Sequence, residues 1–591
     1  MSATPEVLIS IEPGRNKLGV FEDLRHVQEL IGFVPVREIE RIATRRGVGV
    51  KDVHTVASFY PHFHLKPPIR VDVRVCDDMS CHLNGSRALK KSLELQYANA
   101  TDLVQVRDIS CVGRCDHAPV VSINEHYFEH CSFRDVVTIV DKEILAPREE
   151  RHSPAPRSPE QRGIEIQCDP YATEEDHYSI FRFLLANKNF DEILGRLKTG
   201  ELRGMGGAGF PAHIKWEGAR KSPGKEKFVV CNADESEPGT IKDRFILQYL
   251  PHMVFEGMMV CGAIVGAQKG YLYIRHEYEL QTEVLQEELK RIYARGLLGK
   301  NILGSGIDFD LEVFVSPGGY ICGEETALME AIQGNRSEPR NKPPRTVNSG
   351  VWGKPTALNN VETFCHAITI LGKGGEWYHN AGLPGSPGIK FVGVTGHVRH
   401  PGVFEVPMGT SYRDLIYKYA GGPPEGHEVV GFAPSGPSSG YLPASMLDTE
   451  MNWDKLKALN SMVGSGAVVV VADHGCMLDM ALNAVAFYRN ESCGKCSPCR
   501  IGTQKLVDLL SNWVNGDVGS GDMNMLRDLS NVLRTASLCG LGQISPAPIQ
   551  SVMKNFPEIM RQHIEDKHCS AGICFANAPV TPKQEMQRSA P

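Results

Sequence analysis

The sequence predicts a multidomain α/β protein that ends in a helical domain. A length of 591 residues corresponds to about three to five domains. Between residues 166 and 385, strand-like runs such as KFVVCNA and GYLYIRH alternate with helical runs such as ELQTEVLQEELKRIYARG. This alternation is typical of an α/β sheet covered by helices. From 473 to 568 apolar residues recur at helical spacing, which predicts a helical domain.

The N-terminal region, residues 1–142, predicts a smaller α/β unit. Short helices are expected between 20 and 65, and the alternating segment PPIRVDVRVCDD predicts a strand that ends at Cys76. A helix at SRALKKSLELQYA and a strand pair at APVVSINEHYF follow. Residues 143–165 are rich in proline and charge and show no periodicity, so we expect a linker there.

Residues 386–472 predict a β-grasp-like domain. The segment FVGVTGHVRHPGVFEVP has the pattern of a β-hairpin, and SYRDLIYKYAGG predicts a helix after it. The helical domain at 473–568 comes next, and residues 569–591 form a C-terminal tail.

Two sets of four cysteines predict iron–sulfur clusters. One set consists of two pairs, which fits a 2Fe–2S cluster with one pair on each iron: Cys76, Cys81, Cys111 and Cys115. The other set has three cysteines at x2 spacing and a distant fourth, which fits a 4Fe–4S cluster: Cys493, Cys496, Cys499 and Cys539. Two such clusters in one chain indicate electron transfer.

Zinc is the alternative for these cysteines, because structural zinc also binds four thiolates. It remains open, above all for the N-terminal set. Disulfides fit less well, because MSATPEVLIS has neither the basic nor the apolar region of a secretory signal. The 17 cysteines are sparse and odd in number. We therefore expect a reducing, cytoplasmic location.

Composition limits the partners that the chain can have. A net charge of −7 provides no basic field for nucleic acid. The most apolar stretch, residues 462–472, is too short to span a bilayer. We expect a soluble protein that binds no nucleic acid and does not insert directly into a membrane.

Four further motifs suggest a nucleotide or flavin site. The glycine-rich loop RGMGGAGFPAHIKW (203–216) lies before a predicted helix, where backbone amides can approach a phosphate, although a simple tight turn is the alternative. CNADESEPGT and SPGGYICGEETAL each place acidic residues just after a strand. GKPTALNNVETF holds a dense polar cluster.

In this order, the motifs resemble the NADH-binding flavoprotein subunit of respiratory complex I. Those that carry the resemblance are GMGGAGFP, CNADESEPGT, YICGEETAL, KPP, NNVET, ESCGKCSPCRIGT and SLCGLG. The same subunit type serves NAD-reducing hydrogenases and NAD-dependent formate dehydrogenases. The stretches VCDDMSCHLNG and SCVGRCDHAPVVSIN resemble the thioredoxin-like 2Fe–2S subunit that partners it, here fused to the same chain.

The resemblance implies a Rossmann-like FMN and NADH domain, an SLBB-type β-grasp domain and hydride chemistry on FMN, with no catalytic acid or base from the protein. It implies that the FMN phosphate is held by Gly204, Gly206, Gly207, Ala208, Gly209 and Lys215, with Asn359, Asn360 and Thr363 beside them. The ribityl chain and ring would contact Asn232, Asp234, Glu235, Tyr320, Gly323 and Glu324. The NADH pocket would contain Phe210, Glu237, Glu325 and Lys342.

The chain departs from the family pattern at three positions. Met205 stands where arginine is common, Arg345 replaces an apolar residue after KPP, and Gly218 replaces an aromatic residue. Arg345 could stack on adenine, pair with a 2′-phosphate or simply face solvent. NADH is the expected nucleotide, because Glu237 and Glu325 disfavour a further phosphate.

Three other cysteines have weaker assignments. Cys569 and Cys574 form an x4 pair, but only 17 residues follow, so a complete extra cluster is not expected. Cys322 is expected to be a buried structural thiol.

The sequence thus predicts an NADH:acceptor oxidoreductase (diaphorase) subunit of a soluble complex, with FMN, NAD(H), one 2Fe–2S and one 4Fe–4S cluster. Its expected partners are an iron–sulfur relay and a formate dehydrogenase or hydrogenase catalytic subunit. The alternative is a non-catalytic iron–sulfur or zinc scaffold that relays electrons.

Overall fold

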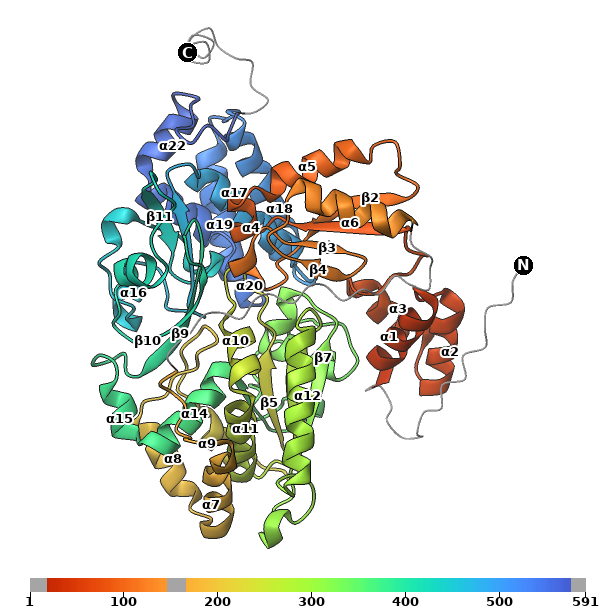
Figure 1. The fold of residues 1–591 in the computed structure, drawn as a ribbon, viewed down its shortest axis with the longest axis vertical. Coiled ribbons are helices and arrows are strands. Elements are labelled where there is room, and N and C mark those ends of the chain that lie inside the picture. The colour runs from red at the N-terminus through yellow and green to blue at the C-terminus, as the bar shows by residue number, and fades with distance from the viewer. Residues whose placement is uncertain (1–18, 146–165, 576–591) are drawn as a thin grey trace.

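A computed structural model describes residues 19–145 and 166–575. The described part of the chain begins with three short helices that form a unit beside the central domain (Figure 1). They are α1 (Val20–Ile31), α2 (Val36–Arg46) and α3 (Val50–Phe59). Phe21 of α1 packs edge-on against Phe314 of the central sheet, with ring centroids 6.2 Å apart. The Tyr60 hydroxyl donates a hydrogen bond to the Asn335 carbonyl at 2.9 Å, so this unit is fixed to the central domain.

The second unit is a four-stranded sheet of order β2-β1-β3-β4 with helices against it. Its elements are β1 (Val71–Cys76), α4 (Met79–Leu83), α5 (Ser86–Gln96), β2 (Val104–Ile109), β3 (Val121–Ile123), β4 (His126–Phe128) and α6 (Phe133–Leu145). β1 is parallel to β2 and antiparallel to β3. The predicted strand ending at Cys76 and the predicted strand pair are confirmed. Helix α6 runs to Leu145, so the first three residues of the predicted linker are helical; residues 146–165 lie outside the described part of the chain.

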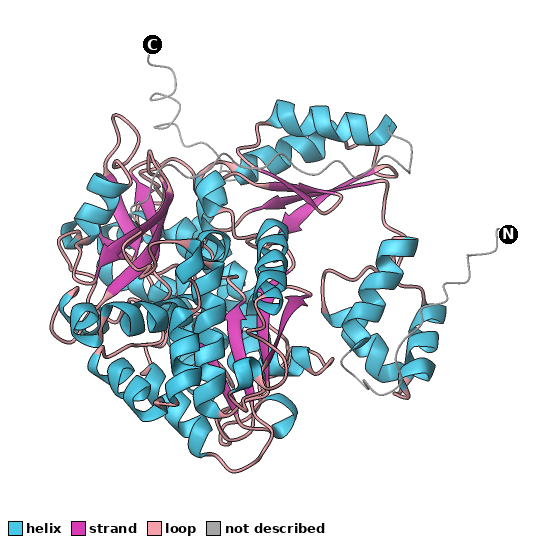
Figure 2. Ribbon diagram, turned by 60° about the horizontal axis from the view of Figure 1, so that its bottom comes forward, coloured by secondary structure: helices cyan, strands magenta, loops and turns pink. Residues whose placement is uncertain are grey.

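The central domain is built on a parallel sheet of order β7-β6-β5-β8. Figure 2 shows strands in magenta with helices in cyan packed around them. The strands are β5 (Phe228–Ala233), β6 (Lys269–Arg275), β7 (Asp310–Ser316) and β8 (Thr356–Asn360). The helices are α7 (Ser179–Asn187), α8 (Phe190–Thr199), α9 (Ala212–Lys221), α10 (Lys242–Tyr249), α11 (Pro251–Val265), α12 (Glu279–Ala294), α13 (Glu325–Ile332), α14 (Val361–Lys373) and α15 (Gly375–Asn380).

Alternate residues of β5 pack in two different cores, because successive side chains of a strand point to opposite faces. Val229 and Cys231 lie in the core that contains α11 and α14. Phe228 and Val230 lie in the core that contains α13 and the three N-terminal helices. The sheet is therefore buried on both faces, and its strands deliver their following loops to one common edge.

The β-grasp-like domain is a five-stranded sheet of order β10-β9-β13-β11-β12. Its elements are β9 (Ile389–Gly396), β10 (Gly402–Pro407), β11 (Val429–Ala433), β12 (Leu442–Pro443), α16 (Trp453–Ala458) and β13 (Ala467–Ala472). The predicted hairpin is confirmed as β9 and β10. The helix predicted at SYRDLIYKYAGG is present, and its residues Asp414–Tyr419 are π-helical. The Ala420 N–H donates to the Leu415 carbonyl five residues back, and two glycines with positive φ then end the turn.

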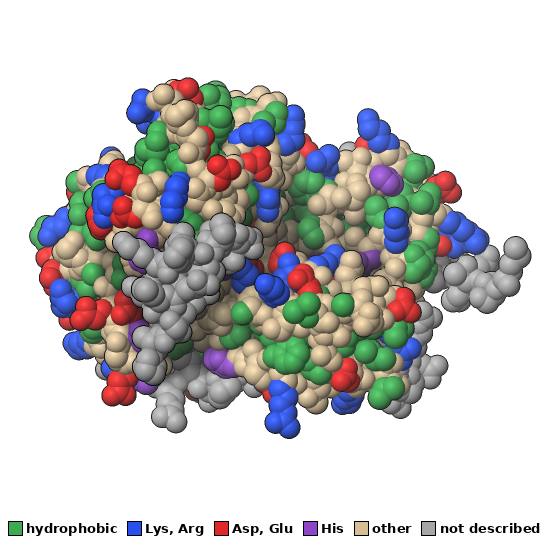
Figure 3. Space-filling model, turned by 90° about the horizontal axis from the view of Figure 1, so that it is seen from above, with side chains coloured by type: hydrophobic (Ala, Val, Ile, Leu, Met, Phe, Trp, Pro, Cys, Tyr) green, Lys and Arg blue, Asp and Glu red, His purple; other side chains and the backbone are tan. Residues whose placement is uncertain are grey.

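The C-terminal domain is helical as predicted. It comprises α17 (Met477–Asn490), α18 (Ser497–Val514), α19 (Asp522–Ala536), α20 (Gly540–Ile544), α21 (Ala547–Asn555) and α22 (Pro557–Ile564). The following residues up to 575 pack on this domain, although the sequence predicts a tail there. Among the described residues no helix has both the length and the apolar character needed to cross a membrane. On the face shown in Figure 3, positive and negative side chains are interspersed.

Candidate functional site

The glycine-rich loop lies at the carboxyl edge of the parallel sheet. The Met205 backbone N–H donates to the Thr363 hydroxyl at 2.9 Å, which ties the loop to the first turn of α14. Gly207 and Gly209 have φ of 143° and 64°, conformations that other residues rarely adopt. A Cβ on Gly206 would lie 2.9 Å from the Cβ of Asn360. The space between Gly206 and Asn360 therefore has room for backbone but not for a side chain. Ala208, in the same loop, is exposed.

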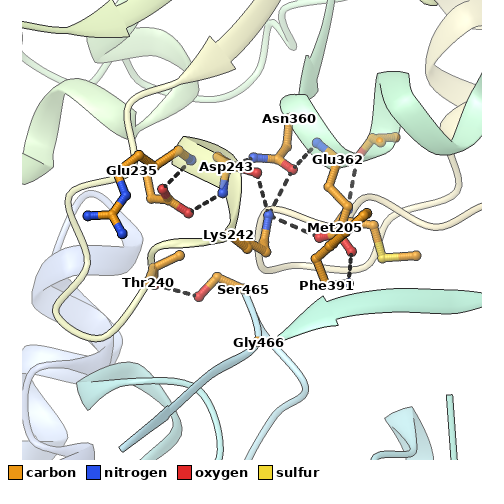
Figure 4. Close-up of polar contacts among 12 residues, drawn as sticks. Met205, Glu235, Thr240, Lys242, Asp243, Asn360, Glu362, Phe391, Ser465 and Gly466 are labelled. Carbon is orange, nitrogen blue, oxygen red and sulfur yellow. Dashed lines mark hydrogen bonds and ion pairs between the residues drawn. The ribbon is translucent and has the colours of Figure 1, made fainter. Parts of the chain in front are cut away.

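A buried network of charged side chains lies next to the glycine-rich loop (Figure 4). The Glu362 carboxylate accepts from Lys242 at 3.0 Å and from Lys390 at 3.1 Å, and all three side chains are fully buried. Lys242 also contacts Asp243 at 2.6 Å and Asn360 at 3.3 Å. Burial alone would raise the pKa of Glu362, but the two ammonium groups hold it well below its usual range. Because charges of both signs are paired, the network fixes the residues that frame the loop.

Unsatisfied polar atoms mark the edge of the sheet as a place for a polar ligand. In the described part of the chain, the buried Asn359 Nδ2 and Asp234 Oδ2 have no hydrogen-bond partner. Asn359 is held in place by Trp216, whose indole N–H donates to its Oδ1 at 2.9 Å. Asn232 donates to the Gly323 carbonyl at 2.8 Å, which joins the end of β5 to the turn before α13. A buried donor or acceptor without a protein partner is available to a ligand. With the glycine cradle, they fit a phosphate-bearing flavin.

Three acids follow β5 in the segment DESE. Burial raises the pKa of Asp234, Glu235 and Glu237. Glu235 accepts from the backbone N–H groups of Asp243 and Arg244 at 2.7 and 2.9 Å, so both of its oxygens have protein donors. Glu237 accepts from the Ser438 N–H of the β-grasp domain at 3.1 Å.

The turn before α13 carries the other candidate side chains. Glu324 caps α13 by accepting from the N–H groups of its first turn. Lys342 lies between two carboxylates, 2.9 Å from Glu324 and 2.6 Å from Glu325. Burial lowers the pKa of Lys215, whose ammonium donates to the Leu358 carbonyl at 3.3 Å.

The remaining candidates of the nucleotide pocket are more open. Phe210 is 38% exposed, and the Arg345 side chain is also exposed. Met205, where the family pattern has arginine, is instead buried. Cys322 is fully buried, as the sequence predicts.

The N-terminal set of cysteines is brought together in the protein interior. All four are buried: Cys76, Cys81, Cys111 and Cys115. The sulfur atoms of Cys111 and Cys115 are 3.3 Å apart, and the Gly113 N–H donates to Cys111 at 3.5 Å. Four buried thiols with N–H donors suit an iron–sulfur cluster, since thiolate is its usual ligand and hydrogen bonds to sulfur tune it.

The second set also converges. Cys493, Cys496, Cys499 and Cys539 line one cavity together with Ile321. Cys496 and Cys539 immediately precede α18 and α20, so helix starts position them. Tyr320, next to Ile321, donates its N–H to Glu491 at 2.7 Å. The turn Tyr320–Gly323 therefore lies between the carboxyl edge of the parallel sheet and this cavity.

Sequence reasoning missed the supporting charges Lys242, Glu362 and Lys390, and also Arg275. Arg275 is buried and donates to the carbonyls of Glu235 and Cys111 at 2.6 and 2.7 Å. The one signal was a charged residue, Lys390, in the mostly apolar segment IKFVGVTG. The pairing itself depends on segments far apart in the chain.

Four family models match the chain. They are the Nuo51 FMN-binding domain (197–369), the NADH-ubiquinone oxidoreductase-F iron–sulfur binding region (479–563), the thioredoxin-like 2Fe–2S ferredoxin (7–143) and the SLBB domain (391–441).

Curated relatives and solved structures agree with these models. NADP-reducing hydrogenase subunit HndC of Solidesulfovibrio fructosivorans is 41% identical over 385 residues, 65% of this chain and 78% of its own length. The F subunit of NADH-quinone oxidoreductase from Escherichia coli K12 is 37% identical over 414 residues, which is 69% of this chain and 93% of its own length. A chain of an NAD+-reducing NiFe-hydrogenase in the H2-reduced state superposes with a TM-score of 0.83 at 28% identity, covering 93% of this chain and 94% of that one.

Proposed function

The chain belongs to the family of the F subunits of NADH-quinone oxidoreductase, and on that premise we propose that it is the NADH-oxidising subunit of a complex with a hydrogenase or formate dehydrogenase catalytic subunit. It is a diaphorase-type oxidoreductase with FMN, 2Fe–2S and 4Fe–4S domains. Relatives that are subunits of NADH-quinone oxidoreductases or hydrogenases support a multi-subunit complex. The identity of the catalytic partner and the expected cytoplasmic location remain predictions.

The observation that carries the proposal is that loops at the carboxyl edge of the parallel sheet, where we place the flavin, contact both cysteine sites. On one side, Gly239 of the loop after β5 donates its N–H to the Cys115 sulfur at 3.2 Å. On the other side, Ile321 lines the cavity of the second cysteine set. A bound flavin accepts two electrons as a hydride and releases them singly. Such a group at this edge would have one cysteine site on each side, and we assign the site of Cys493, Cys496, Cys499 and Cys539 as the exit to the partner.

We assign the binding roles from the geometry of the edge. The loop from Gly204 to Gly209 presents backbone to the phosphate, and the unpartnered Asn359 Nδ2 is free to donate to it. Asp234 has one unpartnered oxygen for a ring or ribityl donor. Glu325 and Lys342, which form an ion pair, would provide a charged rim for the nicotinamide nucleotide, and the exposed Phe210 would provide an apolar surface for it. Glu235 would position the site without touching the flavin, because both of its carboxylate oxygens already accept from N–H groups at the start of α10.

Cys499→Ser tests the proposal in the purified holoprotein. It should lose the 4Fe–4S iron but keep FMN and the 2Fe–2S iron, and NADH should still bleach the flavin at a near-normal rate. Electron delivery to an external iron–sulfur acceptor should fall by at least about tenfold, because the exit site is damaged while the hydride site is not. Loss of flavin reduction with FMN still bound would refute the assignment. A colourless wild-type protein without flavin absorption would instead favour the scaffold alternative.

A further inference from the structure

Four metal-ligating side chains outside the two cluster sites meet in the C-terminal domain. The ligand atoms of Cys476, His563, Cys569 and Cys574 all lie within 4.8 Å of one another. Cys476 immediately precedes α17, His563 lies in the last turn of α22, and the two other cysteines follow α22. The first three residues are buried and Cys574 is partly buried. The group therefore joins three separate segments at one buried point.

The distances suit one ion better than a cluster. A tetrahedral zinc site with metal–sulfur bonds of about 2.3 Å separates neighbouring ligand atoms by roughly 3.5–3.8 Å. The Cys476 sulfur and the His563 Nε2 are 3.4 Å apart. An iron–sulfur cluster would hold its ligands further apart, because ligands on different irons are separated by the cluster itself.

The imidazole of His563 is oriented as a ligand. Its Nδ1 lies 2.8 Å from the carbonyl oxygen of Ile559, so Nδ1 carries the proton and donates it. Nε2 then presents its lone pair toward the three sulfurs, which is the usual arrangement for a metal-bound histidine. Phe575 stacks on the ring, with centroids 5.4 Å apart, and fixes its tilt.

The two C-terminal cysteines occupy a short turn. The Gly572 N–H donates to the Cys569 carbonyl at 2.9 Å, and Gly572 has a φ of 69°. The turn brings both thiols to the same side, as in cysteine knuckles with x2 to x4 spacing. Beyond it, the Phe575 N–H donates to the Val514 carbonyl at 2.9 Å, which holds the turn on α18.

Ordinary core packing does not account for this group. The three cysteines belong to the apolar core of the C-terminal domain and form no disulfide. An imidazole lone pair directed at three thiols gains no strong hydrogen bond there, since S–H is a weak donor. A divalent cation satisfies all four groups at once and compensates the charge of the thiolates.

We propose that Cys476, His563, Cys569 and Cys574 bind one structural Zn²⁺. Two other groups of neighbouring ligands are weaker candidates among the described residues. His427, Asp473 and His474 are all exposed. In the group Asp169, His177 and His252, the Asp169 carboxylate and the His252 Nε2 already pair with each other at 3.2 Å.

The site would stabilise the contact between the C-terminal domain and the N-terminal cysteine domain. Asp479, in the first turn of α17 and three residues after Cys476, accepts from His82 at 2.5 Å and from Arg87 at 3.1 Å. Fixing the start of α17 to α22 and to the C-terminal turn therefore fixes this acceptor. Zinc sites of this closed type contribute to folding rather than to catalysis.

Metal analysis of the full chain loaded with FMN and iron tests the proposal. We expect about one zinc per chain, and X-ray absorption at the zinc edge should show three sulfurs near 2.3 Å and one nitrogen near 2.0–2.1 Å. Cys569→Ser combined with Cys574→Ser should lower zinc to less than about a tenth of the wild-type content. Iron and FMN should stay at wild-type levels, while proteolysis of the segment after α22 becomes faster.

Ser570→Ala is the matched control, because it changes the same turn without touching a ligand atom; it should keep its zinc. Cys131→Ser tests a buried cysteine elsewhere and should also keep it. Three results would overturn the proposal: no zinc in the wild type, zinc bound to oxygen ligands, or loss of iron rather than zinc in the double variant. If the double variant fails to fold, the X-ray absorption of the wild type at the zinc edge still shows whether zinc is bound by three sulfurs and one nitrogen.

Discussion

The sulfur of Cys115 accepts a hydrogen bond from the backbone N–H of Gly239, 3.2 Å away. This bond joins the N-terminal cysteine domain to the loop after β5 at the carboxyl edge of the parallel sheet, although 124 positions separate the two residues. A Cβ on Gly239 would lie 2.6 Å from a methyl group of Val469, so glycine is required at this close approach. The contact places one predicted electron carrier directly against the predicted site of hydride transfer.

Gly206→Ala should weaken FMN binding. The new methyl group would lie 2.9 Å from the Asn360 Cβ, and Asn360 cannot move easily because Lys242 and Asp243 hold its side chain. We expect a cost of about 1–3 kcal/mol from overpacking, measured as lower FMN content after dialysis and a lower Tm of the holoprotein. Gly195→Ala is the control, since a Cβ there meets nothing within 4 Å. Full FMN retention in Gly206→Ala would show that the cradle is not where we place it.

His397 should make stability depend on pH. Its Nδ1 accepts from the Ala472 N–H at 3.1 Å and its Nε2 donates to the Leu83 carbonyl at 3.0 Å. Both nitrogens of the neutral imidazole are therefore hydrogen-bonded. Burial lowers its pKa to about 4. Because the folded pKa lies below the unfolded value of about 6.5, the stabilisation is present above pH 6.5 and is lost as pH falls toward 4, by up to about 3 kcal/mol.

The measurement is the free energy of unfolding between pH 4 and 8 in wild type and in His397→Gln. The variant should lose part of this pH dependence. The control His54→Gln, at an exposed position of α3, should retain the wild-type profile. Parallel profiles for wild type and His397→Gln would contradict the prediction.

Glu325→Gln should alter NADH binding without loss of FMN. Glu325 lies 2.6 Å from Lys342 and neutralises part of its charge. Removal of the carboxylate leaves Lys342 more available to the pyrophosphate of the nucleotide, so KM for NADH should fall several-fold at low salt and less at high salt. An FMN content that falls in parallel would place Glu325 among the flavin contacts instead.

Arg345→Phe tests nucleotide preference. The Arg345 side chain is exposed, whereas two acids of the predicted pocket, Glu237 and Glu325, oppose the extra charge of a 2′-phosphate. Wild type should therefore have the higher kcat/KM for NADH than for NADPH, and the variant should change that ratio by less than about tenfold, below the worth of a charge-assisted hydrogen bond. A wild-type preference for NADPH that collapses in Arg345→Phe would reverse the assignment.

Local patterns predicted much of the fold. The strand ending at Cys76 and the hairpin of β9 and β10 follow from side-chain alternation within a few residues. The segment Asp414–Tyr419 shows the limit of such patterns, because apolar spacing does not distinguish a π-helical turn from an α-helical one. The roles of the flavin and nucleotide residues remain predictions.

The sequence by itself determined the chemistry that the chain can perform, since cysteine spacing and glycine-rich motifs are local properties of adjacent residues. Tertiary structure decided which of these segments meet. Lys390 contacts Glu362, which is 28 positions away in the sequence, and His563 contacts Cys476, which is 87 positions away. No periodicity encodes such pairs, because they form only when separate elements bury their apolar faces together and leave charged or metal-ligating groups to be satisfied inside.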